Sequence, residues 1–167
     1  MTSLDKLTKQ FDAIGQIDLK SGVGEGIAFV QAEAEYRCPV GDGELRESIN
    51  TKVEEQNEAV TGTCFTTKEY APYVELGAGP IGQADHAGIS PEVSPVYTQE
   101  PWWIHESQID AATAERYNFF HIDTKQGRFY RTAGQAAQPF MYPALADNRD
   151  EVTKIIAEAT KKQIRSI

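Results

Sequence analysis

The chain has 167 residues, of which 40% are hydrophobic and 25% charged, a composition typical of one globular domain and not of a disordered or fibrous protein. Its formal net charge of −9 argues against a sequence-specific DNA-binding protein, unless the basic residues gather on one face, because duplex DNA is a dense line of phosphates. No apolar run reaches the roughly 20 residues that a membrane span needs, and residues 1–10 lack the apolar core of a signal peptide. We expect the two cysteines, Cys38 and Cys64, to be reduced thiols.

The amino-terminal residues have helical periodicity. Apolar side chains recur on one face at Leu4, Leu7, Phe11 and Ile14. Thr2 or Ser3 can cap the first turn, and Gly15 ends the run. The pattern predicts a short amphipathic helix.

A glycine-rich stretch, Gly22–Gly26, precedes a second apolar stripe. We interpret the stretch as a flexible joint between two helices, because no strand precedes it and it lacks the Lys-Ser/Thr pair of a phosphate-binding loop. The second helix is predicted from about Gly24 to Tyr36, since Pro39 disfavours helical backbone in the residue before it. Asp42 can then cap a third, short helix that runs through Leu45 and Ile49.

The middle of the chain changes from helical to alternating patterns. Residues Ala59–Thr67 are rich in Val, Thr, Cys and Phe and predict a strand, with a bulge at Gly62. Tyr70–Leu76 is predicted to be a short helix or an extended element. Gly77–Pro95 has no period and many Gly, Pro and Ala residues, so we expect a long loop of the kind that is functional or mobile.

The last third of the chain predicts a hairpin and a helix. Residues 116–123 and 128–132 are β-rich and flank a possible turn at Lys125-Gln126-Gly127. Gly134–Pro139 is expected to be a second loop. A terminal helix follows, with Pro143 in its first turn and an apolar stripe at Val152, Ile155, Ile156 and Ala159. The order of elements predicts an α+β fold over residues 1–167, a single domain of helices packed on an antiparallel sheet with a long C-terminal helix.

Catalytic groups are sparse in this sequence. The three histidines, His86, His105 and His121, share no metal-ligand spacing with one another or with the cysteines. Cys64 with His105 or His121 would be a nucleophile–base pair without positional support. Glu75 and Glu106 stand beside aromatic residues that could raise a carboxylate pKa, so a small hydrolase using Glu75 or Glu106 with His105 remains an alternative. A binding module that uses the long loop is another.

Trp102 and Trp103 are adjacent, and a strand would turn their side chains to opposite faces. If one ring is exposed, it indicates an interface, because aromatic residues concentrate binding energy there. Alternatively, both rings cover an exposed end of the core. The sequence leaves these two interpretations open.

Three stretches in one order resemble a known family. They are Arg37-Cys38-Pro39-Val40-Gly41-Asp42-Gly43-Glu44-Leu45-Arg46-Glu47-Ser48-Ile49, Tyr70-Ala71-Pro72-Tyr73-Val74-Glu75-Leu76-Gly77-Ala78-Gly79, and Gln138-Pro139-Phe140-Met141-Tyr142-Pro143-Ala144-Leu145. The chain from about Gly24 to its carboxyl end is similar to the gene-product-ten-like tail-component family of long-tailed bacteriophages. Asp42 stands where that family usually has Thr, and residues 81–132 do not align with it.

The resemblance implies a small α+β subunit of the virion, assembled in the host cytoplasm, that completes the tail or joins it to the head. It implies no cofactor, metal or catalytic residue. We expect a homo-oligomeric ring, a hexamer that matches a tail tube, in contact with head-closure, tail-terminator or tail-tube proteins. DNA would pass through an acidic lumen without specific binding. Candidate contact residues are Tyr70, Tyr73, Glu75, Trp102, Trp103 and Phe140, while Leu45, Ile49, Phe140 and Leu145 resemble core anchors.

Overall fold

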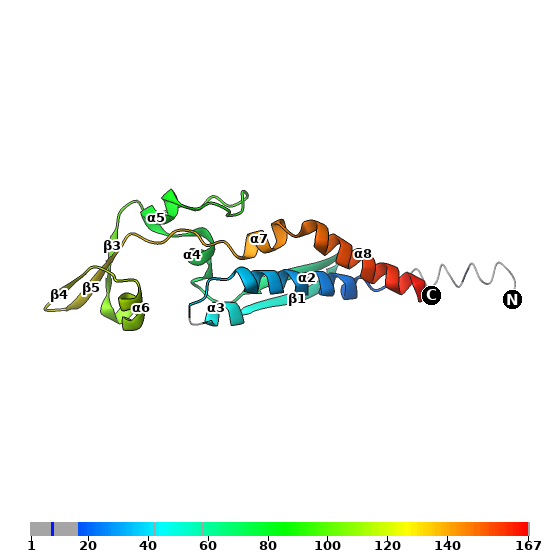
Figure 1. Cartoon of the computed structure of the whole chain (residues 1–167), viewed down its shortest axis with the longest axis horizontal. Coiled ribbons are helices and arrows are strands. Elements are labelled where there is room, and N and C mark those ends of the chain that lie inside the picture. Colours follow the sequence, from blue (N-terminus) through cyan, green and yellow to red (C-terminus); the bar gives the residue numbers. More distant parts are fainter. Residues whose placement is uncertain (1–7, 9–16, 42, 58, 167) are drawn as a thin grey trace. The chain divides into compact units, whose positions relative to one another are not determined.

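A computed structural model describes residues 8, 17–41, 43–57 and 59–166 (Figure 1). The chain divides into two compact units, residues 1–68 with 140–167 and residues 69–139, and we describe each by itself. Both combine helices with a small antiparallel sheet, so the predicted α+β class is confirmed. A single domain over residues 1–167 stays a prediction. The helix predicted from Leu4, Leu7, Phe11 and Ile14 lies outside the described residues.

The first unit is built on two long helices and a two-stranded sheet. Its elements are α2 (Leu19–Arg37), α3 (Glu44–Glu47), β1 (Ile49–Gln56), β2 (Ala59–Thr66), α7 (Met141–Ala146) and α8 (Arg149–Arg165). Helix α2 contacts both strands, α7 and α8, so it forms the centre of this unit. Its buried residues are Gly22, Gly26, Val30 and Ala34.

The prediction that Gly22–Gly26 is a joint was wrong, because these residues lie inside α2. A Cβ atom added to Gly22 would lie 3.3 Å from the backbone oxygen of Ile156, and one added to Gly26 would lie 3.1 Å from Ile156 Cγ1. The two glycines therefore let the backbones of α2 and α8 approach closely. Local helix propensity disfavours glycine, but this tertiary contact overrides it.

Both ends of α2 are tied to distant parts of the chain. At the start, the Asp18 carboxylate accepts a hydrogen bond from Lys20 N–H, and the Gln163 side chain of α8 exchanges two hydrogen bonds with the Asp18 backbone, at 2.9 and 2.8 Å. At the end, Arg37 forms an ion pair with Asp147, which lies between α7 and α8, at 2.7 Å. Helix α2 ends before Pro39, as predicted.

Helix α3 is shorter than predicted. It begins after Gly43, which has a φ of +95°, and Ile49 opens β1 and does not belong to the helix. Asp42, the predicted cap, lies outside the described residues. The sequence did not predict β1, because Asn50, Lys52, Glu54 and Gln56 give it few strand-favouring side chains.

Strand β2 confirms the strand predicted over 59–67, but the bulge expected at Gly62 was wrong. Strands β1 and β2 pair residue by residue from Ile49–Thr66 to Gln56–Ala59, with Gly62 opposite Val53. A Cβ atom on Gly62 would lie 3.0 Å from both Ile27 Cβ and Val23 Cγ1 of α2. Gly62 is therefore needed because the helix packs directly on the strand at this point.

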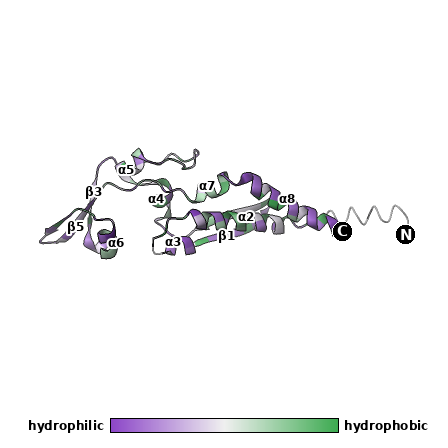
Figure 2. Cartoon of the chain, in the orientation of Figure 1, coloured by the Kyte–Doolittle hydropathy of each residue, from purple (hydrophilic) through white to green (hydrophobic). Residues whose placement is uncertain are grey.

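The predicted terminal helix is confirmed from Arg149, with Pro143 in a separate short helix, α7. Phe140 and Ala144 are fully buried, and Leu45 and Ile49 are also in the core. Leu145 is 45% exposed, so its prediction as a core anchor was wrong: α7 turns it outward while Ala144 faces inward. Figure 2 shows that α8 is largely hydrophilic.

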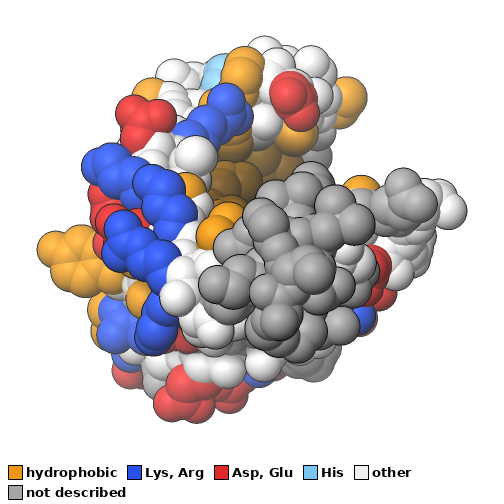
Figure 3. Space-filling model, turned by 90° about the vertical axis from the view of Figure 1, so that its right-hand side faces the viewer, with side chains coloured by type: hydrophobic (Ala, Val, Ile, Leu, Met, Phe, Trp, Pro, Cys, Tyr) orange, Lys and Arg blue, Asp and Glu red, His pale blue; other side chains and the backbone are white. Residues whose placement is uncertain are grey.

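Helix α8 ends with Lys162 and Arg165 in its last turn, where the helix dipole favours cations. In Figure 3 the side of the molecule that carries the C-terminus faces the viewer. Lysine and arginine side chains gather along one side of this face. The negative net charge is therefore not spread evenly. None of the described helices is both long enough and apolar enough to cross a lipid bilayer.

The second unit contains short helices and a three-stranded sheet. Its elements are α4 (Ala71–Leu76), α5 (Gly79–Ala84), β3 (Trp102–His105), a 3-10 turn (Glu106–Gln108), α6 (Ala111–Arg116), β4 (His121–Thr124) and β5 (Gly127–Thr132). The strand order is β3-β5-β4, and all neighbours are antiparallel. The predicted hairpin is confirmed as β4–β5, although residues 111–116 form a helix and the strand begins only at His121.

The loop predicted over 77–95 is helical in part, because α5 occupies Gly79–Ala84. The predicted loop over 134–139 lies against this segment: Ala78 forms a β-bridge with Gln135, and Ile81 N–H donates to Ala133 O at 3.1 Å. A Cβ atom on Gly134 would overlap the backbone oxygen of Ala78. Two stretches far apart in sequence thus pack backbone against backbone, and Gly134 makes room for this contact.

An aromatic cavity in the second unit

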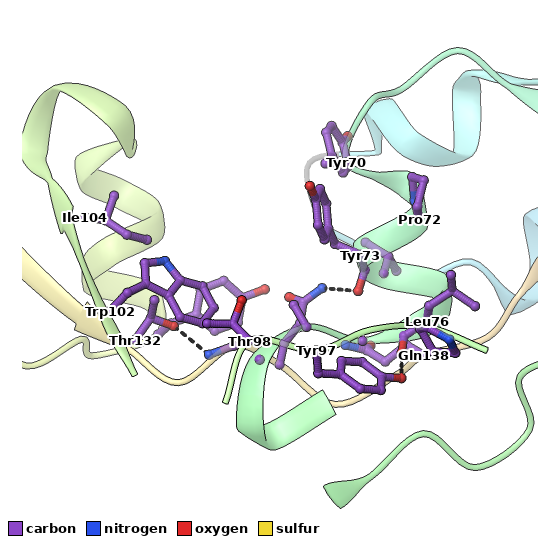
Figure 4. A pocket seen from close by; sticks show the side chains of 18 of the residues that line it. Tyr70, Pro72, Tyr73, Leu76, Tyr97, Thr98, Trp102, Ile104, Thr132 and Gln138 are labelled. Atoms are coloured by element: carbon purple, nitrogen blue, oxygen red, sulfur yellow. Dashed lines mark hydrogen bonds between the residues drawn. The ribbon is translucent and has the colours of Figure 1, made fainter. Parts of the chain in front are cut away.

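The second unit contains an open cavity of about 830 Å³ (Figure 4). All of its lining residues fall between positions 70 and 138. They come from α4, from the segment before β3, from β3 itself, from α6 and the residues after it, and from the 132–138 segment. Its aromatic lining residues are Tyr70, Tyr73, Tyr97, Trp102, Tyr117 and Phe119.

Hydrogen bonds to backbone carbonyl oxygens of α4 hold the walls of the cavity together. The Tyr97 hydroxyl donates to the carbonyl oxygen of Leu76 at 2.7 Å, which fixes the segment before β3 against the end of α4. The Gln135 side-chain amide donates to the carbonyl oxygen of Tyr73 at 2.8 Å (Figure 4). Gln138 N–H donates to the carbonyl oxygen of Val74 at 2.8 Å, so α4 is anchored at three of its residues.

Trp102 is positioned by a glycine. A Cβ atom on Gly79, whose φ is +60°, would lie 2.7 Å from Trp102 Cζ3 and 2.6 Å from Ala133 O. Only glycine fits there, because the indole ring rests on the backbone of α5 and the left-handed φ disfavours other residues. Trp102 and Ile104 alternate with Trp103 and His105 along β3, and the first pair lines the cavity.

Much of this lining is exposed to solvent. The exposed fraction is 60% for Tyr73, 63% for Tyr117 and 98% for Val96. Large exposed apolar patches on a monomer mark sites of interaction with another molecule. The cavity is therefore a candidate binding site, and the chemistry of its walls favours an apolar ligand or peptide face.

Trp103 lies on the other face of the sheet. It is 43% exposed, and its ring lies 6.1 Å from that of Phe120, centroid to centroid; Phe120 is 64% exposed. Ile122, on β4 at the other edge of the sheet, is also exposed. Trp102 and Trp103 thus contribute to two different apolar surfaces, one on each face of the three-stranded sheet.

The groups considered for catalysis form local structural contacts. His105 Nε2 is 3.0 Å from the carbonyl oxygen of Gln126, and His105 Nδ1 is 2.7 Å from Ser107 Oγ. Glu106 accepts a hydrogen bond from Arg128 N–H at 3.0 Å. Both side chains therefore hold the β4–β5 turn, where a Cβ atom on Gly127 would lie 2.6 Å from each of them.

Cys64 is half-buried in β2, and no disulfide joins it to Cys38. Burial raises the pKa of the Cys64 thiol, and the nearby carboxylate of Glu35 raises it further. A raised pKa disfavours the thiolate, which is the nucleophilic form. Within the described part of the chain, no group of three or more His, Cys, Asp or Glu side chains is placed to hold a metal ion.

The structure brings together three of the six predicted contact residues. Tyr70, Tyr73 and Trp102 line one cavity, whereas Glu75 of α4 is not part of its lining and Trp103 faces the opposite side of the sheet. Phe140 is fully buried and belongs to the first unit. Sequence reasoning missed Tyr97, Tyr117 and Phe119, whose only signal was a density of aromatic residues in a segment that aligned with no known pattern.

Residues 1–77 match the family described as "Bacteriophage HK97-gp10, putative tail-component". The family predicted from the sequence is thus confirmed over this part of the chain, which resembles a phage tail component. No curated protein and no solved structure matches the chain.

The matched range contains the first family stretch and most of the second, and ends at Gly77. The third stretch lies beyond it, at residues 138–145. In the structure this third stretch supplies Phe140 and Ala144 to the core of the first unit, and α7 contacts α2. The first and third stretches are therefore parts of the same packed unit.

Proposed function

We propose that this protein is a structural subunit of a phage virion that assembles as a homo-oligomeric ring at the top of the tail or at the head–tail joint. The proposal rests on the tail-component family matched by residues 1–77 and on the apolar surfaces of the second unit. Of the 14 large hydrophobic residues that are exposed in the described chain, nine lie between residues 69 and 139. A subunit that binds copies of itself explains this concentration.

The ring is expected to have six copies, because a tail tube with sixfold symmetry would be matched by six subunits. A head-to-tail contact closes into a ring when its rotation divides a full turn. Native mass spectrometry of the purified protein, over a concentration series, tests this proposal. A mass of six chains supports it, and a discrete dimer at all concentrations contradicts it.

DNA is expected to pass through the lumen of this ring without adhering. The net charge of −9 supports a surface that repels phosphates at long range. Lys162 and Arg165, in the last turn of α8, must then point away from the lumen. Assembled rings mixed with linear duplex DNA in about 0.15 M salt should show no stable complex, and tight binding would contradict the proposed lumen.

An enzymatic role is not part of this proposal. His105 and Glu106, two of the residues considered for a hydrolase, are engaged in the β4–β5 turn. A tail component acts by fitting against its neighbours, and the apolar surfaces on both sides of the three-stranded sheet suit that role.

A further inference from the structure

The aromatic cavity of the second unit has walls that are incompletely covered. Tyr70, Tyr73, Val96 and Tyr117 all line it, and each is at least 42% exposed. Covering apolar surface is favourable by roughly 25 cal/mol per Å². The volume of about 830 Å³ lies within the range of sites that hold a ligand or several side chains of a peptide.

The chain itself contains a segment with the complementary pattern. Sixteen residues precede Ile17, and all but Thr8 lie outside the described part of the structure. Their sequence places Leu4, Leu7, Phe11 and Ile14 on one face of a predicted helix. An amphipathic helix that lays such a face into an apolar groove is a recurrent mode of peptide recognition.

The charges of the two partners are compatible. Residues 69–139 contain nine acidic and four basic side chains, so the second unit is negatively charged. The amino-terminal segment balances Asp5 and Asp12 with Lys6 and Lys9 and adds no net negative charge. The segment therefore adds no charge repulsion to a contact with this unit.

We propose that residues 4–14 of one copy dock into the aromatic cavity of a neighbouring copy, through the face that the sequence pattern assigns to Leu4, Leu7, Phe11 and Ile14. This inference rests on the proposed function in that the partner is a second copy. The contact joins different surfaces of the two copies, so repeating it around an axis produces a ring.

A photo-cross-linking amino acid at position 11 of the full chain tests the proposal directly. Light and isotope-heavy copies are mixed, assembled and irradiated, and the cross-linked peptides are identified by mass spectrometry. The expected products join position 11 of one isotope to residues 70–76, 95–104 or 113–119 of the other. Cross-links found only within copies of one isotope, or only at other surfaces, would overturn the proposal, as would a co-purifying small molecule that fills the cavity.

A pair of variants supplies the control. Leu7→Asp places a carboxylate on the docking face, and Ala13→Asp makes the same change of charge on the opposite face of the predicted helix. Leu7→Asp should lower the yield of mixed-isotope cross-links about tenfold, the effect of about 1.4 kcal/mol, while Ala13→Asp leaves it unchanged. Equal yields from the two variants in rings of unchanged mass would overturn the docking and leave the proposed ring standing.

Discussion

Gly26 of α2 lies against Ile156 of α8, so close that a side chain at this position would crowd the isoleucine. A Cβ atom added at Gly26 would be 3.1 Å from Ile156 Cγ1 and 3.3 Å from Val152 Cγ1. Since α2 also contacts both strands of the first unit, the close helix pair positions the whole unit.

Gly24 and Gly26 should respond in opposite ways to larger side chains. Nothing lies within 4 Å of a Cβ atom on Gly24, so Gly24→Ala should stabilise the protein by roughly 0.5–1 kcal/mol through helix propensity. Gly26→Leu should destabilise it by roughly 1–3 kcal/mol or more, because the helices must separate. Urea unfolding followed by circular dichroism measures both. Similar effects for the two variants would contradict the packing of α2 on α8.

Phe140 is expected to be an anchor of the first unit. Its side chain is fully buried, so Phe140→Ala should cost roughly 3–5 kcal/mol of unfolding free energy. Leu145→Ala, five residues along and 45% exposed, is the matched control and should cost at most about 1 kcal/mol. Denaturant midpoints give the comparison, and an equal loss from both would show that α7 is rotated relative to this structure.

Gly79→Ala should disturb the aromatic cavity through Trp102. The left-handed φ of +60° at Gly79 costs a residue with a Cβ atom about 1–2 kcal/mol, and the added atom would also meet the indole ring at 2.7 Å. We expect Trp102 to move, with a changed near-ultraviolet circular dichroism spectrum. Gly88→Ala, which also has a positive φ but 3.6 Å of space to Pro139, is the control for backbone strain alone. An unchanged spectrum for Gly79→Ala would contradict the contact.

The pH dependence of stability should include a contribution from Asp110. The hydrogen bond from the Thr113 hydroxyl, and those from Thr113 N–H and Ala112 N–H, lower the pKa of Asp110 below its usual value. Because the unfolded chain then takes up the proton first, this stabilisation is present above a pH of about 4 and is lost as the pH falls through the folded pKa.

Asp110→Asn retains a side chain that can cap α6 but does not titrate. The stability difference between about pH 5 and pH 3 should therefore be smaller in the variant than in the original protein. Thermal unfolding across this range measures it. A variant that is as acid-sensitive as the original would assign the acid sensitivity to other carboxylates.

Trp103→Ala should weaken assembly more than folding. Trp103 is 43% exposed and lies beside the exposed Phe120, so its truncation removes interface area and little core. Trp102→Ala, in contrast, removes a ring packed on Gly79 and should lower thermal stability. Sedimentation velocity and thermal unfolding of both variants separate the effects. An equal loss of stability in monomers of both variants would contradict an interface role for Trp103.

The sequence predicted those elements whose local pattern agrees with their tertiary role. The stripe of Val152, Ile155, Ile156 and Ala159 identified α8, and the turn at Lys125-Gln126-Gly127 identified the β4–β5 hairpin. In both, the periodicity and the turn residues carry the information within a few positions.

The elements that were missed depend on contacts between distant residues. Gly22 and Gly26 resemble a flexible joint until α8, more than 120 residues away in the sequence, is packed on them. The cavity gathers Tyr73, Trp102 and Tyr117 from three separate segments, and no local spacing relates them. Strand β1 was missed because alternate positions on one face are polar and solvated.

Electron microscopy of phage particles made without this protein, with the gene restored in parallel as a control, tests the central claim most directly. The account predicts filled heads and finished tails that remain unjoined, and intact particles once the protein is supplied again. Intact, infectious particles formed in its absence would contradict a role in completing the tail or joining it to the head.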